Sequence, residues 1–238
     1  MPIPKNLSKS PFEINKPKDR WKPDIDKVKE PIQQFNAPFV EKIRKEVYEW
    51  RQFGYDGASI TSKSLLNFWF NYQHKNNFQY YFAQRESVES IVYLFESKKI
   101  RFNKELLTLD SWGITEDFLQ DDWLRLIIKQ ATGSGKTKVL SLLIAWSYFN
   151  NLYEKDSLLT KNFLLIAPNT IVLDRLRNDI EGLKIFQTDP IVPYSGYEGK
   201  SWEFAPKVHI QDEIKSISDS GNIFLTNIQR FADRSKQN

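Results

Sequence analysis

A loop of small residues constrains the fold more than any other part of this sequence. It reads Gln130-Ala-Thr-Gly-Ser-Gly-Lys-Thr137, and it stands between an apolar run at residues 124–128 and a nearly all-apolar stretch at residues 136–150. This order predicts a buried strand, a tight turn and a helix. A strand that leads through a short turn straight into a helix is typical of α/β proteins.

The chain after this loop continues the alternation. A second apolar run at residues 163–167 precedes an amphipathic stretch at residues 171–182, and short apolar runs follow at residues 207–211 and 223–226. Strands that alternate with helices through short joins form parallel sheets with helices on both faces. We therefore predict an α/β fold built on a parallel sheet that is buried on both faces.

The composition of the loop is that of an anion-binding turn. Gly133 and Gly135 can take backbone angles that direct successive N–H groups to one point. A helix that begins near Lys136 adds its unpaired amides and its dipole. The Lys136 ammonium suits the β- and γ-phosphates of a nucleotide, and the Thr137 hydroxyl is a hard ligand for Mg²⁺. The loop therefore predicts nucleotide binding.

One residue of the loop departs from the general glycine-rich pattern. That pattern has glycine five positions before Gly135, where this chain has Gln130. The departure argues against the many phosphate-binding families whose first glycine makes the turn. A glycine-rich turn that precedes a helix by chance is the alternative, and the expected strand and helix on either side weaken it.

Composition excludes several kinds of site. The 238 residues include no cysteine and only two histidines, His74 and His209, which excludes disulfides, thiol catalysis, cysteine-based zinc sites and a histidine-rich metal cage. Lys and Arg number 34 against 30 Asp and Glu, so a nucleic-acid partner is permitted but not demanded. Residues 1–12 hold no secretory signal, and the longest apolar run is shorter than a membrane span. We expect a cytoplasmic protein with no membrane partner.

The composition also changes along the chain. Residues 1–38 hold seven of the eleven prolines, which predicts an extended arm. Apolar periodicity predicts helices at residues 40–53, 64–74 and 84–96, and residues 98–122 show no clear pattern. We expect a proline-rich arm and helical segment over residues 1–75, followed by a nucleotide-binding domain over residues 76–238.

Three blocks in addition to the loop resemble a known family. They are Phe82-Ala-Gln-Arg-Glu86, the stretch from Asn162 to Leu176 around Ala167-Pro-Asn-Thr170, and Gly221-Asn-Ile-Phe-Leu-Thr-Asn-Ile-Gln-Arg230. Together they resemble a superfamily 2 helicase-type ATPase of the DEAD/DEAH-box kind. The similarity is strongest to the N-terminal part of the Res (R) subunit of type III restriction enzymes. The resemblance implies a first RecA-like P-loop domain that uses ATP and Mg²⁺ and acts on DNA.

The resemblance also implies roles for single residues. Lys136 and Thr137 would be catalytic, Thr137 would hold the metal, and Gln84 would bind the adenine edge through its amide. The complete set expected to bind the nucleotide is Gln84, Thr132, Gly133, Ser134, Gly135, Lys136 and Thr137. A solvent-facing glutamine at a helix start is the alternative for Gln84.

A second set is implied for nucleic acid. The residues expected to contact the sugar-phosphate backbone of DNA are Pro168, Asn169, Thr170, Arg175 and Thr226. An ion pair with Asp179, four residues further along the helix, is the alternative for Arg175. Four aromatic residues, Trp69, Tyr72, Tyr80 and Tyr81, could stack on bases, but such density is more often part of a core.

The acidic pair that such ATPases use with Mg²⁺ is not found where the family would have it. It is expected after residues 223–226, and the sequence ends at Asn238. The pair Asp212-Glu213 precedes that strand, so we expect it to be an exposed strand end. The domain is therefore expected to be incomplete, and this chain alone to be inactive.

Two interpretations follow from the sequence. The first is the ATP-binding part of an ATP-dependent DNA helicase or translocase subunit of a restriction-modification system, with a methyltransferase or specificity subunit as candidate partner. The second is a non-catalytic nucleotide- or DNA-binding remnant of such a protein. A small-molecule phosphotransferase ranks last, because the block at residues 168–170 has no role in one.

Overall fold

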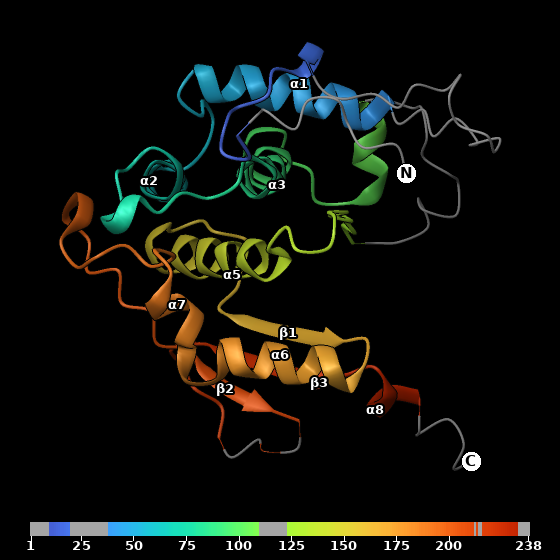
Figure 1. Cartoon of the computed structure of the whole chain (residues 1–238), viewed down its shortest axis with the longest axis vertical. Helices are drawn as coiled ribbons and strands as arrows, with labels where there is room; N and C mark the ends of the chain where they lie inside the picture. The colour runs from blue at the N-terminus through green and yellow to red at the C-terminus, as the bar shows by residue number, and fades with distance from the viewer. Residues whose placement is uncertain (1–9, 20–37, 110–122, 212, 214–215, 233–238) are drawn as a thin grey trace. The chain divides into compact units, whose positions relative to one another are not determined.

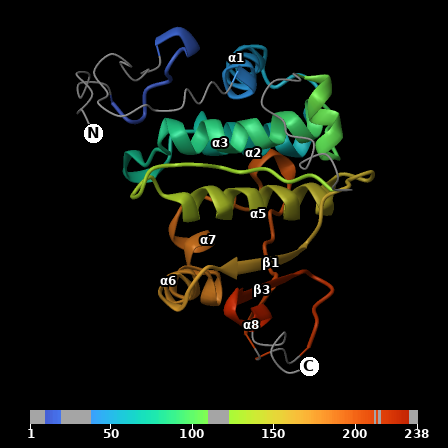
Figure 2. The same cartoon turned by 90° about the vertical axis from the view of Figure 1, so that its right-hand side faces the viewer.

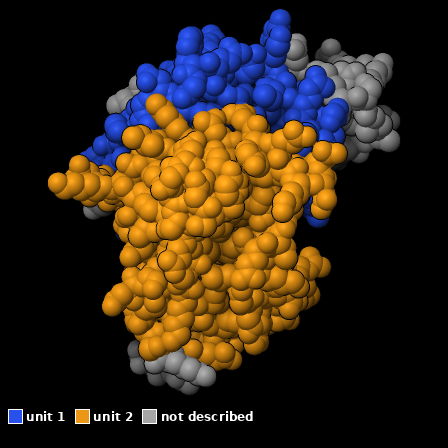
Figure 3. All heavy atoms as spheres, turned by 90° about the vertical axis from the view of Figure 1, so that its left-hand side faces the viewer, with its two compact units in different colours: residues 1–58, 79–134 blue, residues 59–78, 135–238 orange. Residues whose placement is uncertain are grey.

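The computed structural model describes residues 10–19, 38–109, 123–211, 213 and 216–232 (Figure 1). The chain divides into two compact units, coloured separately in Figure 3. The first unit comprises residues 1–58 and 79–134, and the second comprises residues 59–78 and 135–238. Most of the proline-rich arm lies outside the described residues. The domain boundary expected between residues 75 and 76 stays a prediction.

The first unit is built on two helices, α1 (Pro38–Gln52) and α3 (Phe82–Val92). The predicted apolar stripe of α1 is buried, with Ile43, Val47 and Trp50 no more than 6% exposed. This confirms the helix expected at residues 40–53. A π-helical turn (Tyr93–Ser97) continues α3, and a 3-10 helix (Asn103–Thr108) follows it.

A buried ionic network joins α1 to α3. The Glu89 side chain is completely buried and accepts hydrogen bonds from Arg51, Arg85 and Tyr55. Burial is the main cause that raises the pKa of the Tyr55 hydroxyl, and the Glu89 carboxylate raises it further. Tyr55 therefore stays protonated and donates to Glu89. The network fixes the helix that carries the Phe82–Glu86 block.

The second unit contains a three-stranded parallel sheet. Its strands β1 (Asn162–Ala167), β2 (Lys207–Ile210) and β3 (Asn222–Asn227) lie in the order β1-β3-β2. Its helices are α2 (Ile60–Phe70), α5 (Lys136–Tyr153), α6 (Thr170–Ile180), α7 (Lys184–Thr188) and α8 (Gln229–Ala232). Figures 1 and 2 show α5 and α6 alongside the sheet. The predicted α/β fold with parallel strands is confirmed.

Neutral hydrogen bonds attach α2 to α5 within this unit. The indole of Trp146 donates to the Ser62 hydroxyl at 2.7 Å, and the Asn150 amide donates to Ser59 at 3.0 Å. The helix expected at residues 64–74 in fact spans Ile60–Phe70. It begins earlier because the Ser59 hydroxyl accepts from the amide of Ser62 and caps it.

A buried amide joins the strands near their amino ends. The Asn222 side chain accepts from His209 at 3.0 Å and donates to Asn162 at 2.8 Å, so it connects all three strands. The preceding Gly221 has φ +119°, and a Cβ there would lie 2.7 Å from the carbonyl oxygen of Lys161. Only glycine fits this joint without displacement.

Two expectations about strands are wrong. The sheet is not buried on both faces, because Leu164 and Ile166 of β1 are 57% and 46% exposed. Alternate side chains of a strand point to opposite faces, and the residues of β1 that alternate with these, Leu165 and Ala167, are buried. The helix α6 packs against β1 and β3, which covers one face of this pair.

The run at residues 124–128 forms no strand. It has no regular secondary structure, and Ile127 is 91% exposed. One of its backbone amides, that of Arg125, donates a hydrogen bond to the side-chain oxygen of Asn103 at 2.8 Å and not to a neighbouring strand. The loop that follows is therefore held by other contacts than those of a sheet. In the described part of the chain, every helix is too short or too polar to cross a membrane.

Candidate functional site

The boundary between the two compact units runs through the predicted phosphate loop, between Ser134 and Gly135. In the first unit, the loop turns at Gly133, which has φ +81° and open space where a side chain would be. Thr132 and Gly133 are exposed. The amide of Ser134 makes a long hydrogen bond of 3.4 Å to the carbonyl of Ala131. This half of the loop therefore presents its backbone to solvent.

The second half of the loop begins helix α5. Gly135 is the N-terminal cap, with φ +77°, and its carbonyl accepts from the amides of Lys138 and Val139. Lys136 is exposed at the first helical position, and Thr137 is half-buried beside it. The predicted helix at residues 136–150 is confirmed and continues to Tyr153.

The loop amides meet the requirement for an anion site. Within the described residues, the amides of Thr132, Gly133, Gly135 and Thr137 have no hydrogen-bond partner. Exposed amides at the start of a helix bind phosphate oxygens, and the helix dipole favours negative charge there. The amides on each side of the unit boundary are therefore each of a kind that fits a phosphate oxygen, and the Lys136 ammonium and the Thr137 hydroxyl are adjacent in sequence.

Gln84 lies at the start of α3 and is only 2% exposed. Its side-chain oxygen accepts from the amide of Tyr81 at 2.9 Å, and its amide nitrogen donates to the carbonyl of Ser134 at 2.9 Å. It is therefore not the solvent-facing glutamine of the alternative. Its expected contact with adenine stays a prediction, and the structure directs its amide to the phosphate loop.

Gln130, which the sequence showed only as a departure from the pattern, also contacts α3. Its amide nitrogen donates to the carbonyl of Ala83 at 2.9 Å and to the hydroxyl of Ser87 at 2.8 Å. Its side-chain oxygen lies 3.2 Å from the hydroxyl of Ser134, which also donates to Ala131 at 2.8 Å. The contacts of Gln130 with Ala83 and Ser87 could not be predicted from sequence spacing, because more than 40 positions separate the partners.

A second lysine near the loop has a different environment. The Lys138 ammonium lies 2.6 Å from the carboxylate of Asp189 and over the ring of Phe78. This pairing neutralises its charge within the second unit. A phosphate at Lys138 would have to compete with this ion pair.

The predicted nucleic-acid residues lie at the carboxyl edge of the sheet. Pro168, Asn169 and Thr170 directly follow β1 and are exposed. Asn169 caps α6, because its side-chain oxygen accepts from the amide of Val172 at 2.9 Å. Thr226 pairs in register with Ile166, so the ends of β1 and β3 bring Thr226 near this block.

Arg175 is exposed on α6, and the alternative ion pair with Asp179 is absent from the described ion pairs of this helix. Arg177 pairs instead with Glu181, with nitrogen and oxygen 3.1 Å apart. In Figure 1 the first turn of α5 and the carboxyl ends of β1 and β3 are on the same, right-hand side of the second unit. The expected phosphate and nucleic-acid residues of this unit thus share one side.

The four aromatic residues considered for base stacking divide into two groups. Trp69 and Tyr80 are buried, at 1% and 6% exposure, and the indole of Trp69 donates to the carbonyl of Ile191. Tyr72 and Tyr81 are 44% and 39% exposed. Two of the four are therefore core residues.

One family model matches the chain, over residues 77–238, and it describes the res subunit of type III restriction enzymes. The chain belongs to this family. No curated protein and no solved structure gives a significant match. The match covers the loop and all three blocks that carried the resemblance. It makes the fold a RecA-like P-loop domain and the family activity that of a helicase-type ATP hydrolase.

At the family level, Res-type domains use ATP and Mg²⁺ and act on DNA. One acidic candidate for Mg²⁺ in this Res-type chain cannot be placed, because Asp212 of the Asp212-Glu213 pair lies outside the described residues. In the described residues, no three histidine, aspartate or glutamate side chains gather as a metal site. The Thr137 hydroxyl stays the ligand that the sequence predicts for this loop.

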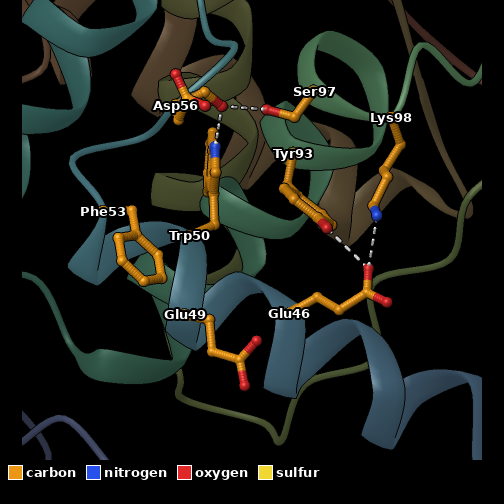
Figure 4. Close-up of a pocket in the computed structure, with 8 residues that line it drawn as sticks. All are labelled: Glu46, Glu49, Trp50, Phe53, Asp56, Tyr93, Ser97 and Lys98. Atoms are coloured by element: carbon orange, nitrogen blue, oxygen red, sulfur yellow. Dashed lines mark hydrogen bonds and ion pairs between the residues drawn. The ribbon is translucent and has the colours of Figure 1, made fainter.

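A cleft of about 460 Å³ lies elsewhere in the first unit of the Res-type chain (Figure 4). Its lining consists of Glu46, Glu49, Trp50, Phe53, Asp56, Tyr93, Ser97 and Lys98. Figure 4 shows the Lys98 ammonium and the Tyr93 hydroxyl both directed at Glu46, at 3.2 Å and 2.7 Å. Three carboxylates against one ammonium disfavour a polyphosphate, so this cleft does not compete with the loop as a nucleotide site.

Proposed function

We propose that this chain is the ATP-binding part of an ATP-dependent DNA helicase or translocase subunit of a restriction-modification system. The observation that supports it most is that the amides of Thr132, Gly133, Gly135 and Thr137 have no hydrogen-bond partner within the described residues, next to the exposed Lys136. The family match supplies the class of reaction, and the loop supplies the residues.

Each group of the loop would have a distinct role. The amides would donate to phosphate oxygens, and the first turn of α5 would add its dipole. The Lys136 ammonium would offset charge on the β- and γ-phosphates, and the Thr137 hydroxyl would hold Mg²⁺. When bound, Mg²⁺ supplies further neutralisation of the phosphate charge.

The exposed block after β1 would contact DNA. The first amides of α6, at Thr170 and Ile171, lie at a helix N-terminus, which suits the phosphate groups of a strand. Arg175 and Thr226 would add contacts from α6 and β3. Such contacts fix the position of a strand without reading its sequence.

The first test is Lys136→Ala, with binding of a fluorescent ATP analogue as the measurement. We expect the affinity to fall by roughly 10- to 100-fold, which is the loss of one charge-assisted hydrogen bond. Lys155→Ala is the matched control, because Lys155 is an exposed lysine just past the other end of α5 and its loss changes the net charge equally. Equal binding by both variants and the wild type would refute the proposal.

ATP hydrolysis with and without single-stranded DNA separates the two interpretations from the sequence. A motor hydrolyses ATP faster when DNA is present, whereas a non-catalytic remnant binds ATP or DNA without hydrolysing ATP.

Arg175→Ala tests the expected contact with DNA. It should weaken DNA binding about equally for all sequences, and the slope of log affinity against log salt concentration should fall by about one phosphate contact.

A further inference from the structure

The segment of the loop that belongs to the first unit is held at both of its ends by α3. At its start, Gln130 uses both hydrogens of its amide, one on the carbonyl of Ala83 and one on the hydroxyl of Ser87. At its end, Ser134 receives a hydrogen bond from Gln84 on its carbonyl oxygen. The three residues between these anchors include Thr132 and Gly133, whose amides have no partner among the described residues.

Two further hydrogen bonds of this segment are internal to it, because the amide and the hydroxyl of Ser134 both donate to the carbonyl of Ala131. The residues that precede it form no strand, and Ile127 is 91% exposed, so no sheet ladder fixes the start of the turn. Gly133 has open space around it and can change conformation at low cost. The two glutamine side chains therefore attach the loop to α3 and restrain where its amides point.

The helix that carries these restraints is itself rigidly held. Glu89 on α3 binds Arg51 of α1 and Arg85 of α3 in a buried network. The side-chain oxygen of Gln84 further fixes the first turn by accepting from Tyr81. Its 2% exposure leaves no access for a base unless the side chain leaves both partners.

We propose that Gln84 and Gln130 are positioning residues that set the phosphate loop, and that their contribution to nucleotide binding is independent of the base. The proposal rests on the proposed function, since it assumes that the loop binds the phosphates. It differs from the role that the resemblance implies for Gln84, which is recognition of adenine.

The test compares three ligands in the presence of Mg²⁺: ATP, GTP and inorganic tripolyphosphate. The variants are Gln130→Met and Gln84→Met, which keep the length of the side chain and remove its amide without adding charge. We expect each to lower the affinity for all three ligands by a similar factor, roughly tenfold, as for one or two lost hydrogen bonds. Gln187→Met is the control, because the exposed Gln187 on α7 also donates its amide to a backbone carbonyl, that of Gly182, and the same substitution removes that amide. Its affinities for the three ligands should match those of the wild type.

The outcomes are distinguishable. A loss confined to ATP, with tripolyphosphate binding unchanged, would show that Gln84 recognises adenine and would overturn the proposal. Unchanged affinity of folded Gln130→Met for all three ligands would overturn it as well, and this variant is informative even if Gln84→Met fails to fold. If the wild type binds none of the three, the proposed function itself fails and the inference fails with it.

Discussion

The two compact units bury polar groups of different kinds. In the first unit, two guanidinium groups and one carboxylate are buried together, where Glu89 meets Arg51 and Arg85. In the second unit, the main buried polar joints are neutral, such as Asn222 between the strands and Trp146 on Ser62.

This difference predicts that the stability of the two units responds differently to mutation. A buried charge that loses its partner is stabilised neither by water nor by a counter-charge, so its loss is severe. A mutation at a neutral contact removes about one hydrogen bond, and the free energy lost depends on how well the surrounding residues relax. The first unit should therefore depend on single charged residues, and the second on close packing around its backbone.

The largest expected effect is that of Glu89→Gln. The substitution keeps the shape of the side chain and leaves two buried guanidinium groups without a counter-charge, which should lower the free energy of unfolding by about 3–5 kcal/mol. Amide hydrogen exchange of α1 and α3 measures it.

A matched control exists on α6. Arg177 and Glu181 have the same spacing as Arg85 and Glu89, but their side chains are 43% and 53% exposed. Glu181→Gln should therefore leave exchange on α6 unchanged. A mild effect of Glu89→Gln, similar to that of Glu181→Gln, would show that water reaches the network and that the two units do not differ in this respect.

The next effect tests the packing of the second unit. Gly221→Ala places a Cβ 2.7 Å from the carbonyl of Lys161 at φ +119°, which should cost about 3 kcal/mol in strain and overpacking. Gly182→Ala is the control, because Gly182 also has positive φ (+65°) but nothing within 4 Å of the added carbon. It should cost about 1 kcal/mol. Denaturant unfolding of both variants measures the difference, and equal costs would remove the argument from close packing.

Two apolar runs show how far the sequence predicts this fold. Residues 124–128 and 163–167 have similar composition, and both were expected to be strands. Only the second is one, because β3 offers it a ladder of backbone partners, whereas Asn103 meets the backbone of the first. Periodicity reports which side chains are apolar, but the partner of a strand is a property of the assembled chain.

The candidate site likewise has features that can be predicted from the sequence and features that cannot. The loop from Thr132 to Thr137 could be predicted because its chemistry is local, with glycine, lysine and threonine at fixed spacing. The engagement of Gln84 and Gln130 could not, because each contact joins residues more than 40 positions apart. The contact of α2 with α5 could not be predicted for the same reason, since Ser62 and Trp146 are 84 positions apart.

The smallest effect concerns a titratable group in the second unit. His74 is 9% exposed beside the rings of Phe68 and Tyr72, and its Nε2 atom has no partner among the described residues. Burial lowers the pKa of His74 below its ordinary value of 6.5. As the pH falls through 6.5, the unfolded chain takes up a proton that the folded chain does not yet bind, so stability decreases towards acid.

For one histidine, the free energy of unfolding should change by at most about 1.4 kcal/mol per pH unit. Denaturant unfolding at pH 7.5 and pH 5.5 measures it, and His74→Phe is the comparison, because it keeps an aromatic ring and removes the titration. The wild type should lose more stability than the variant on acidification, since every other titrating group is present in both. A wild type that gained stability towards acid relative to His74→Phe would mean that the second unit, like the first, can hold a buried charge with a partner.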